Sequence, residues 1–282
     1  MEFGTVEYKS YHLEYYKYGN GPRTFIAFHG HGRHASDFKT FAEDLNATIY
    51  SFNLFFHGKS VYQQNKIKKF EALSHEELKN ILSVVPKKIK AEEYNFIAYS
   101  LGGKFTLNFI SYFPEKINQV ILMAPDGLGH SFYSRSGHFR VFRWWFRRIV
   151  ARPKPFLKLV DFLAKIRLLS GGIKKFMHYQ METPSRRLRA FLSWAYLRDI
   201  FPNHEVIKHN LNKHHIDFIL IMPEHDQIIP LKSGEKFIKK METGRLFKLD
   251  ANHHIFRPGI VPEIKKMLCI LAEQENHDEH KN

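Results

Sequence analysis

The sequence predicts an α/β protein: a mostly parallel sheet flanked by helices, with an inserted helical cap. Apolar segments that read as strands alternate with helical segments, both before residue 128 and after residue 215. These strands are apolar on both faces, which is typical of a parallel sheet covered on both sides. The segment between the two parts lacks this alternation and is strongly basic. We therefore expect a core domain of residues 1–127 and 216–282, and a helical cap (a lid) of residues 128–215.

The elements before the cap follow from hydrophobic periodicity and turn residues. The opening stretch TVEYKSYHLEYYKYG reads as an antiparallel hairpin that would form one edge of the sheet, and Gly19-Asn20-Gly21-Pro22 is the turn that follows it. Further strands are expected in TFIAFHG, ATIYSFNL, YNFIAYS and QVILMAP. Helices are expected over Ser36–Leu45, from Ser74 towards Lys90 and over Leu101–Tyr112. Ser74 suits a helix start, because its hydroxyl is an N-cap and acids follow in the first turn.

The alternation resumes after the cap. IDFILIMPEHD and GRLFKLD read as strands, and Leu231–Met241 and Pro258–Gln274 read as helices. The N-terminus lacks the charged-then-apolar order of a secretory signal. No stretch approaches about 18 uncharged apolar residues, the length that a membrane-spanning helix needs. We therefore expect a cytoplasmic protein.

The net charge is concentrated in the cap. The 282-residue chain carries a formal charge of +15, and residues 128–215 hold 18 Lys+Arg against 4 Asp+Glu, a balance of +14. The remainder holds 43 − 18 = 25 basic and 28 − 4 = 24 acidic residues, a balance of +1. The excess charge therefore belongs to one module rather than to the whole surface.

The single cysteine, Cys269, excludes an internal disulfide.

The stretch NFIAYSLGGKF has the pattern of a nucleophile elbow. An apolar strand ends at Ser100, and Gly102 and Gly103 follow at the start of a helix. A serine on such a strained strand-to-helix turn requires small neighbours. Later strand ends supply the acid Asp226 in PEHDQIIP and the base His253 in ANHHIF, with His254 as the alternative base. Asp126, in MAPDG, is an alternative acid.

The chain order Ser, Asp, His predicts one converging site. Each of the three residues follows a separate strand, and the carboxyl ends of parallel strands meet at one edge of the sheet. In AFHGHGRHASDF, Gly30 and Gly32 allow a tight turn after the third strand. The backbone N–H groups of His31 and Leu101 would then serve as the two oxyanion donors.

With FHGHG, SFNLFFHGKS, AYSLGG, MPEHDQIIP and ANHH in this order, the whole chain resembles the α/β-hydrolase superfamily, specifically its cap-containing branch of serine esterases and lysophospholipase-like enzymes. The resemblance implies the α/β-hydrolase fold, with Ser100 as nucleophile, Asp226 as acid and His253 as base. It also implies no cofactor. Asn53 and Phe55 stand where the family usually shows Asp and Gly, and His57 and Gly58 in that motif are expected to be structural.

The cap has two interpretations. RVFRWWFRRIVAR would form a helix with an apolar, aromatic face beside a cationic one, which is typical of a helix at an anionic lipid surface. Alternatively, the same apolar face roofs the active site. SRRLR at 185–189 offers arginines for a phosphate or carboxylate group of a substrate.

Two other classes of ligand are not expected. The aromatic residues lie in apolar helix patterns rather than on a stacking platform, so nucleic acid is not a predicted partner. No metal is predicted, because the cap histidines lack ligand spacing with an acid or cysteine; these are His204, His209, His214 and His215.

The predicted function is hydrolysis of an ester or thioester bond in a hydrophobic, small-molecule acyl substrate, through an acyl-enzyme. The basic cap favours an anionic group on that substrate, and it leaves peripheral contact with anionic lipid as a further expectation. A C–C bond hydrolase or an acyltransferase using the same triad is the first alternative. A non-enzymatic module that binds membranes through the cap is the second.

Overall fold

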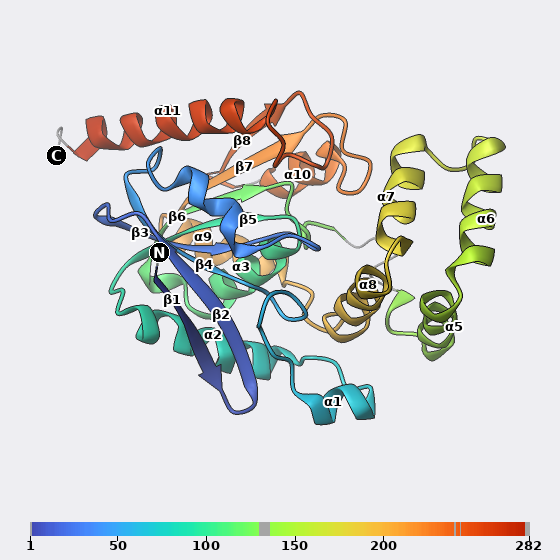
Figure 1. Ribbon diagram of the computed structural model, residues 1–282. Helices are drawn as coiled ribbons and strands as arrows, with labels where there is room; N and C mark the ends of the chain where they lie inside the picture. Colours follow the sequence, from blue (N-terminus) through green and yellow to red (C-terminus); the bar gives the residue numbers. More distant parts are fainter. Residues whose placement is uncertain (1, 130–135, 240, 243, 280–282) are drawn as a thin grey trace.

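A computed structural model describes residues 2–129, 136–239, 241–242 and 244–279. Its centre is an eight-stranded sheet in the order β1-β2-β4-β3-β5-β6-β7-β8 (Figure 1). The strands are β1 (Glu2–Tyr8), β2 (Tyr11–Tyr18), β3 (Arg23–Phe28), β4 (Ala47–Phe52), β5 (Tyr94–Tyr99), β6 (Ile117–Met123), β7 (Asp217–Pro223) and β8 (Gly244–Leu249). β1 pairs antiparallel with β2, and β2 with β4, while the pairs from β4 through β8 are parallel. The predicted mostly parallel sheet with an antiparallel edge is confirmed.

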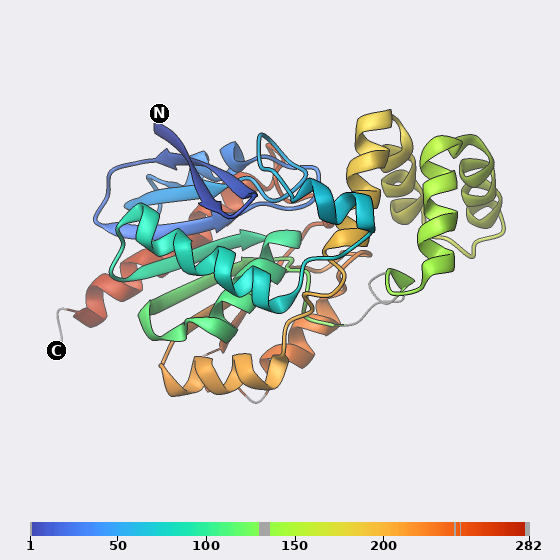
Figure 2. The ribbon, with the colours of Figure 1, turned by 90° about the horizontal axis from the view of Figure 1, so that it is seen from below.

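The sheet is buried on both faces. Along β3, Ile26 and Phe28 face one apolar cluster and Phe25 and Ala27 face the other, because successive side chains of a strand point to opposite sides. The first cluster includes residues of α2 (His75–Ile89), α3 (Leu101–Tyr112), α9 (His204–Lys213) and α10 (Leu231–Ile238). The second includes residues of η1 (Ala35–Phe41) and α11 (Val261–Glu279), which lie across the sheet from α2 and α3 (Figures 1 and 2).

The start of α2 agrees with the sequence prediction. The Ser74 side chain accepts a hydrogen bond from the Glu77 amide, and the Glu77 carboxylate accepts one from the Ser74 amide, which completes a capping box. The helix predicted over Ser36–Leu45 differs, because η1 is a 3₁₀ helix. Its buried residues Ala35, Phe38 and Phe41 are spaced by three, which matches the three residues per turn of a 3₁₀ helix. Two short elements had not been expected, α1 (Gln64–Lys69) and η2 (Pro114–Lys116).

Among the described residues, four helices stand apart from the sheet at one end of the molecule (Figures 1 and 2). They are α5 (Arg140–Ala151), α6 (Pro153–Lys165), α7 (Gly171–Met181) and α8 (Pro184–Tyr196). The predicted cap also contains α9, but this helix packs against α3 of the core, and its Asn210 Nδ2 donates to Ile110 O at 2.9 Å. Residues 130–135 of the predicted cap lie outside the described residues. In the part of the chain that is described, we find no helix with the length and apolarity needed to cross a membrane.

Candidate active site

Ser100 lies in a sharp turn between β5 and α3. Its backbone angles, φ 48° and ψ −117°, are strained for a residue with a side chain. The two glycines that follow permit this turn: a Cβ on Gly102 would lie 1.9 Å from Phe28 O, and one on Gly103 would lie 2.3 Å from the Pro125 Cβ. The small residues that the sequence places after the serine are therefore required by the close approach of α3 to β3 and to the loop after β6.

Three buried side chains form a continuous hydrogen-bonded row. Ser100 Oγ lies 3.0 Å from His253 Nε2, and His253 Nδ1 lies 2.7 Å from Asp226 Oδ2. The other carboxylate oxygen, Asp226 Oδ1, accepts the amides of Ile228 and Ile229 at 2.8 and 2.9 Å. Because Asp226 accepts from the imidazole at Nδ1, the Nε2 atom carries no proton and can accept the Ser100 hydroxyl hydrogen bond.

His253 is also held through its backbone. Tyr99 OH donates a hydrogen bond to His253 O at 2.6 Å. Burial raises the pKa of the Tyr99 hydroxyl far above its usual range, with the nearby Asp226 carboxylate acting in the same direction. The hydroxyl therefore stays protonated and remains a donor.

The alternative acid and base lie elsewhere. Asp126 Oδ2 is 3.4 Å from Lys104 Nζ, and Asp126 Oδ1 accepts the Gly127 amide at 2.7 Å. His254 donates its amide to Asn252 Oδ1 at 3.1 Å, and burial beside His253 lowers the pKa of its ring. The hydrogen-bonded row to Ser100 thus contains Asp226 and His253 rather than Asp126 and His254.

The two expected oxyanion donors flank Ser100. Leu101 is the first residue of α3, where amides have no acceptor within the helix. His31 lies in the loop after β3, and no acceptor for its amide is found among the described residues. This loop approaches Ser100 closely, since a Cβ on Gly30 would lie 2.6 Å from the Tyr99 ring and 3.1 Å from Ser100 Cβ.

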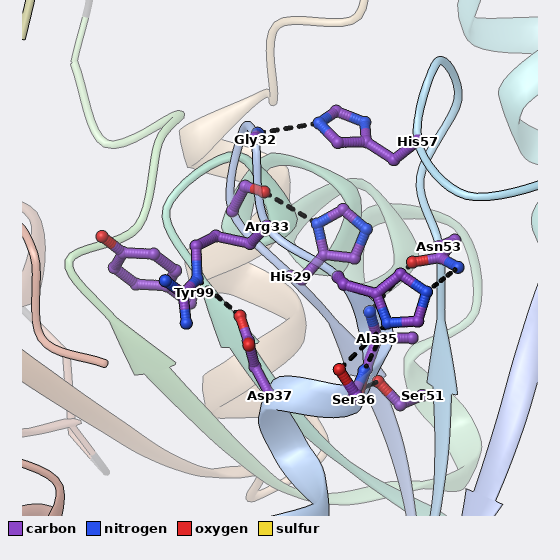
Figure 3. Close-up of polar contacts among 12 residues, drawn as sticks. His29, Gly32, Arg33, Ala35, Ser36, Asp37, Ser51, Asn53, His57 and Tyr99 are labelled. Atoms are coloured by element: carbon purple, nitrogen blue, oxygen red, sulfur yellow. Dashed lines mark hydrogen bonds and ion pairs between the residues drawn. The ribbon is translucent and has the colours of Figure 1, made fainter. Parts of the chain in front are cut away.

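Two buried histidines brace that loop (Figure 3). His57 Nε2 accepts the Gly32 amide at 2.8 Å, while its Nδ1 donates to Phe55 O at 2.9 Å. His29 Nδ1 donates to Gly30 O at 2.7 Å, and its Nε2 accepts the Leu54 amide at 3.2 Å. Burial lowers the pKa of His29 to about 3 and the pKa of His57 well below its ordinary value, so both rings are neutral. The role of His57 in positioning this loop is not evident from its place in SFNLFFHGKS.

The contacts of Asn53 explain why this position holds an amide side chain where the family usually has Asp. Its Oδ1 accepts the Ala35 amide at 2.9 Å, and its Nδ2 donates to Glu14 Oε2 at 2.7 Å. Figure 3 shows Asn53 and Ala35 beside the loop. A carboxylate could not donate to Glu14. Burial raises the pKa of Glu14, but hydrogen bonds from Lys59, Asn53 and Tyr16 outweigh burial and hold that pKa below its usual value.

The comparisons with known proteins agree with this architecture. A sequence model described as serine aminopeptidase, S33, matches residues 22–254. The chain belongs to this family of α/β hydrolases. The fold is also that of an esterase from Thermogutta terrifontis, at 14% identity and a TM-score of 0.66 over 98% of this chain and 99% of the other.

Two further solved structures share the fold of this hydrolase. A meta-cleavage product hydrolase from Pseudomonas fluorescens is 13% identical, with a TM-score of 0.63 over 98% of both chains. An enol-lactonase from Burkholderia xenovorans is 13% identical, with a TM-score of 0.64 over 94% of this chain and 98% of the other. At these identities the likeness concerns the fold.

Among the described residues, three hydrogen bonds join the region of these helices to the loops around the candidate active site of this hydrolase. On α7, Gln180 Oε1 lies 3.2 Å from His31 Nε2. Before α7, Ser170 Oγ donates to Gln227 Oε1 at 2.6 Å, one residue beyond Asp226. On α8, Arg189 Nε donates to Phe56 O at 3.2 Å. Desolvation lowers the pKa of His31 to about 4, so the ring is neutral and donates from Nε2 to Gln180.

The arginines of SRRLR bind other residues of the same chain. Arg186 pairs with Glu182, and Arg187 donates from Nη1 to Met181 O at 2.9 Å and from Nε to Val150 O at 3.0 Å. Arg189 donates to Phe56 O, as described above. These contacts give the stretch a structural role, and its recognition of a substrate anion stays a prediction.

Within the described ranges, no group of three His, Cys, Asp or Glu side chains could hold a metal ion.

Proposed function

We propose that this hydrolase cleaves an ester or thioester bond of a hydrophobic acyl substrate through an acyl-enzyme on Ser100. The observation that carries the proposal is the row Ser100–His253–Asp226, with contacts of 3.0 and 2.7 Å. A serine is a weak nucleophile at neutral pH, and it needs such an adjacent base to act.

The geometry supports a two-step reaction. His253 Nε2 takes the proton of Ser100 Oγ as this oxygen attacks the acyl carbon, and Asp226 stabilises the imidazolium that forms. The amides of His31 and Leu101 would hold the oxyanion, and one such donor contributes about 2.7–4 kcal/mol to lowering the barrier. His253 then gives its proton to the leaving alcohol or thiol. Water, activated by the same base, attacks the acyl-enzyme and releases the acid.

The charge of the cap favours an ester or thioester over the N-terminal amide of a peptide. An aminopeptidase, the activity in the family's description, must accommodate a cationic α-ammonium group. Here residues 128–215 carry 18 basic against 4 acidic residues, so the field above the site opposes a cation and attracts an anion. A neutral or anionic acyl substrate suits this field better.

Hydrolysis of chromogenic acyl esters of increasing chain length tests the proposal. Ser100→Ala should abolish turnover at every length, whereas Ser111→Ala, at the far end of the same helix, should retain it. Loss of activity in both variants, or in neither, would contradict the assignment of Ser100. At low salt, an anionic ester should be cleaved with a higher kcat/KM than a neutral ester of equal chain length, and equal values would remove the anionic preference.

Product analysis separates the alternatives on the same triad. Water and another acceptor compete for the same acyl-enzyme, so the triad alone does not distinguish a hydrolase from an acyltransferase. With an added alcohol, we expect free acid as the main product. A dominant new ester would instead identify a transferase. Absence of turnover on every ester would favour a C–C bond hydrolase or a non-enzymatic membrane-binding module.

A further inference from the structure

The part of the molecule beyond the core exposes an unusual number of large apolar side chains. Ten of the fifteen large hydrophobic residues exposed in the described chain fall within residues 139–188. They are Phe139, Val141, Trp144, Trp145, Leu159, Phe162, Ile166, Leu168, Tyr179 and Leu188. Most of them lie on or beside α5 and α6. These two helices and the C-terminal end of α11 lie at opposite ends of the molecule (Figure 1).

Helix α5 has two apolar faces, of which only one is covered. On the inner face, the Phe146 ring packs on Trp194 and Phe191 of α8, at centroid distances of 5.0 and 5.6 Å. On the outer face, Trp144 and Trp145 are 54% and 46% exposed. The packing of α5 on α8 is therefore supplied by the inner residues, and it leaves Trp144 and Trp145 about half exposed.

Helix α6, which packs against α5, also exposes apolar side chains. Leu159, Phe162 and Ile166 are exposed and are spaced by three and four residues, which puts them on one side of the helix, while Val160 is buried. The rings of Trp145 and Phe156 meet edge-on at 6.0 Å and join the two helices. Together, the exposed apolar side chains of residues 139–168 form what we call the outer cap face.

The outer cap face is bordered by positive charge. Residues 139–168 hold nine Lys and Arg and one acid, Asp161. That acid is paired with Lys174 Nζ and His178 Nε2 of α7, each at 2.9 Å. The Arg148 guanidinium lies 4.0 Å from the Trp144 ring centroid, so charge and aromatic surface are in direct contact.

We propose that the outer cap face docks on an anionic lipid surface. Tryptophans and phenylalanines favour the interfacial layer of a bilayer, and Lys and Arg beside them bind anionic headgroups while their stems stay in the apolar layer. A second copy of this chain suits the face less well. A two-fold contact would bring the nine basic residues of each copy together with one paired acid on each side.

The arrangement of the helices is compatible with docking. α5 and α6 lie at the end of the molecule, and α7 lies between α6 and the core in both views (Figures 1 and 2). The same α7 contacts the candidate active site through Gln180. Docking through α5 and α6 would therefore leave the core free of the bilayer and keep the cap contacts of the site in place.

Cosedimentation with vesicles tests the proposal without any dependence on catalysis, because Ser100→Ala protein can be used. We expect binding to vesicles of equal parts phosphatidylcholine and phosphatidylglycerol, release with rising sodium chloride, and little binding to phosphatidylcholine alone. Tryptophan emission should shift to the blue on binding. The chain has three tryptophans and Trp194 is buried, so this signal reports on Trp144 and Trp145.

Matched double variants localise the contact. Lys154→Glu with Lys158→Glu should weaken vesicle binding about tenfold or more, because both charges border the outer cap face. Lys87→Glu with Lys88→Glu, an equal charge change at exposed positions of α2, should have much less effect. Likewise, Trp144→Ser with Phe162→Ser should weaken binding and reduce the emission shift, which then reports on Trp145 alone. Phe3→Ser with Ile270→Ser, at exposed positions of β1 and α11, should not.

Three results would overturn the proposal. The first is an absence of binding to the anionic vesicles. The second is an equal loss of vesicle binding in each double variant of the cap and in its control double variant of the core. Binding would then depend on the overall composition of the surface and not on the outer cap face. The third is a dimer in sedimentation equilibrium without lipid that Trp144→Ser with Phe162→Ser converts to a monomer, which would assign the outer cap face to self-association. None of these results depends on whether Ser100 is a nucleophile.

Discussion

The carboxyl edge of the sheet and the outer cap face differ in how their side chains are used. At the sheet edge, buried polar groups such as His29, His57 and Asp226 are joined to specific partners by short hydrogen bonds. On the outer cap face, large apolar side chains such as Trp144 and Phe162 are exposed. The side chains of the candidate active site are thus positioned by hydrogen bonds that also join separate parts of the fold. Because the side chains of the outer cap face are largely exposed, we propose that they serve recognition.

After Ser100→Ala, the largest effect is expected at Asp226, the proposed acid. Asp226→Asn should lower kcat by about 10⁴, because an amide can no longer hold His253 in the tautomer that accepts the serine proton. Asp126→Asn, which alters only the contacts to Lys104 and Gly127, should change kcat far less. Steady-state kinetics on one chromogenic ester measures both. A larger loss in Asp126→Asn would reverse the assignment of the acid.

The loop that carries the His31 amide should depend on His57. His57→Ala removes the acceptor for the Gly32 amide, so the loop is no longer held at the position that the oxyanion requires. We expect kcat to fall by about 10²-fold with little change in KM, since a displacement of about 1 Å can have this effect. The exposed His225, which pairs with Asp250, gives the control His225→Ala. A rise in KM at constant kcat would instead indicate a role in binding substrate.

The buried neutral histidines should make the core sensitive to acid. Burial holds the pKa of His29 at about 3 against 6.5 for a free ring, so below pH 6.5 the unfolded chain binds a proton that the folded chain does not. The contribution of His29 is full above pH 6.5 and falls as the pH decreases towards 3. Between pH 7 and pH 5 the free energy of unfolding should fall by about 2 kcal/mol for this group.

Urea unfolding at pH 7 and pH 5 measures this loss. His29→Asn should show a smaller loss between the two pH values than the wild-type protein, even if its stability at pH 7 is lower. His225→Asn, with an exposed ring, should keep nearly the whole loss. An unchanged loss in His29→Asn would mean that other groups dominate the acid sensitivity.

The smallest effect is expected for the outer cap face. Trp144→Ser with Phe162→Ser should change the free energy of unfolding by no more than about 0.5 kcal/mol per site, as for surface substitutions in general. Phe146→Ala, on the inner face of α5, should cost about 2 kcal/mol, because its partly buried ring packs on Trp194 and Phe191. Thermal unfolding compares the two. Equal losses would remove the distinction between the inner and outer faces of α5.

Much of the fold and of the candidate site could be predicted from sequence. The spacing of apolar residues in the expected strands and helices predicted the sheet. The positions of Ser100, Asp226 and His253 after separate strands indicated that they lie together at the carboxyl edge of this sheet. The contacts of His57 with Gly32 and of Gln180 with His31 could not be predicted, since 25 and 149 positions separate these pairs. Nothing in local periodicity specifies a hydrogen bond between distant loops.

The sequence by itself determined the class of fold, the order of the candidate catalytic residues and the concentration of charge in residues 128–215, because these follow from local patterns along the chain. Only the tertiary structure decided which neighbouring residue enters the hydrogen-bonded row, His253 or His254. It also decided which side of α5 is covered: Phe146 packs on α8, and Trp144 faces outward. Both outcomes depend on how loops and helices far apart in the chain pack against one another, which determines the partner and the solvent exposure of each side chain.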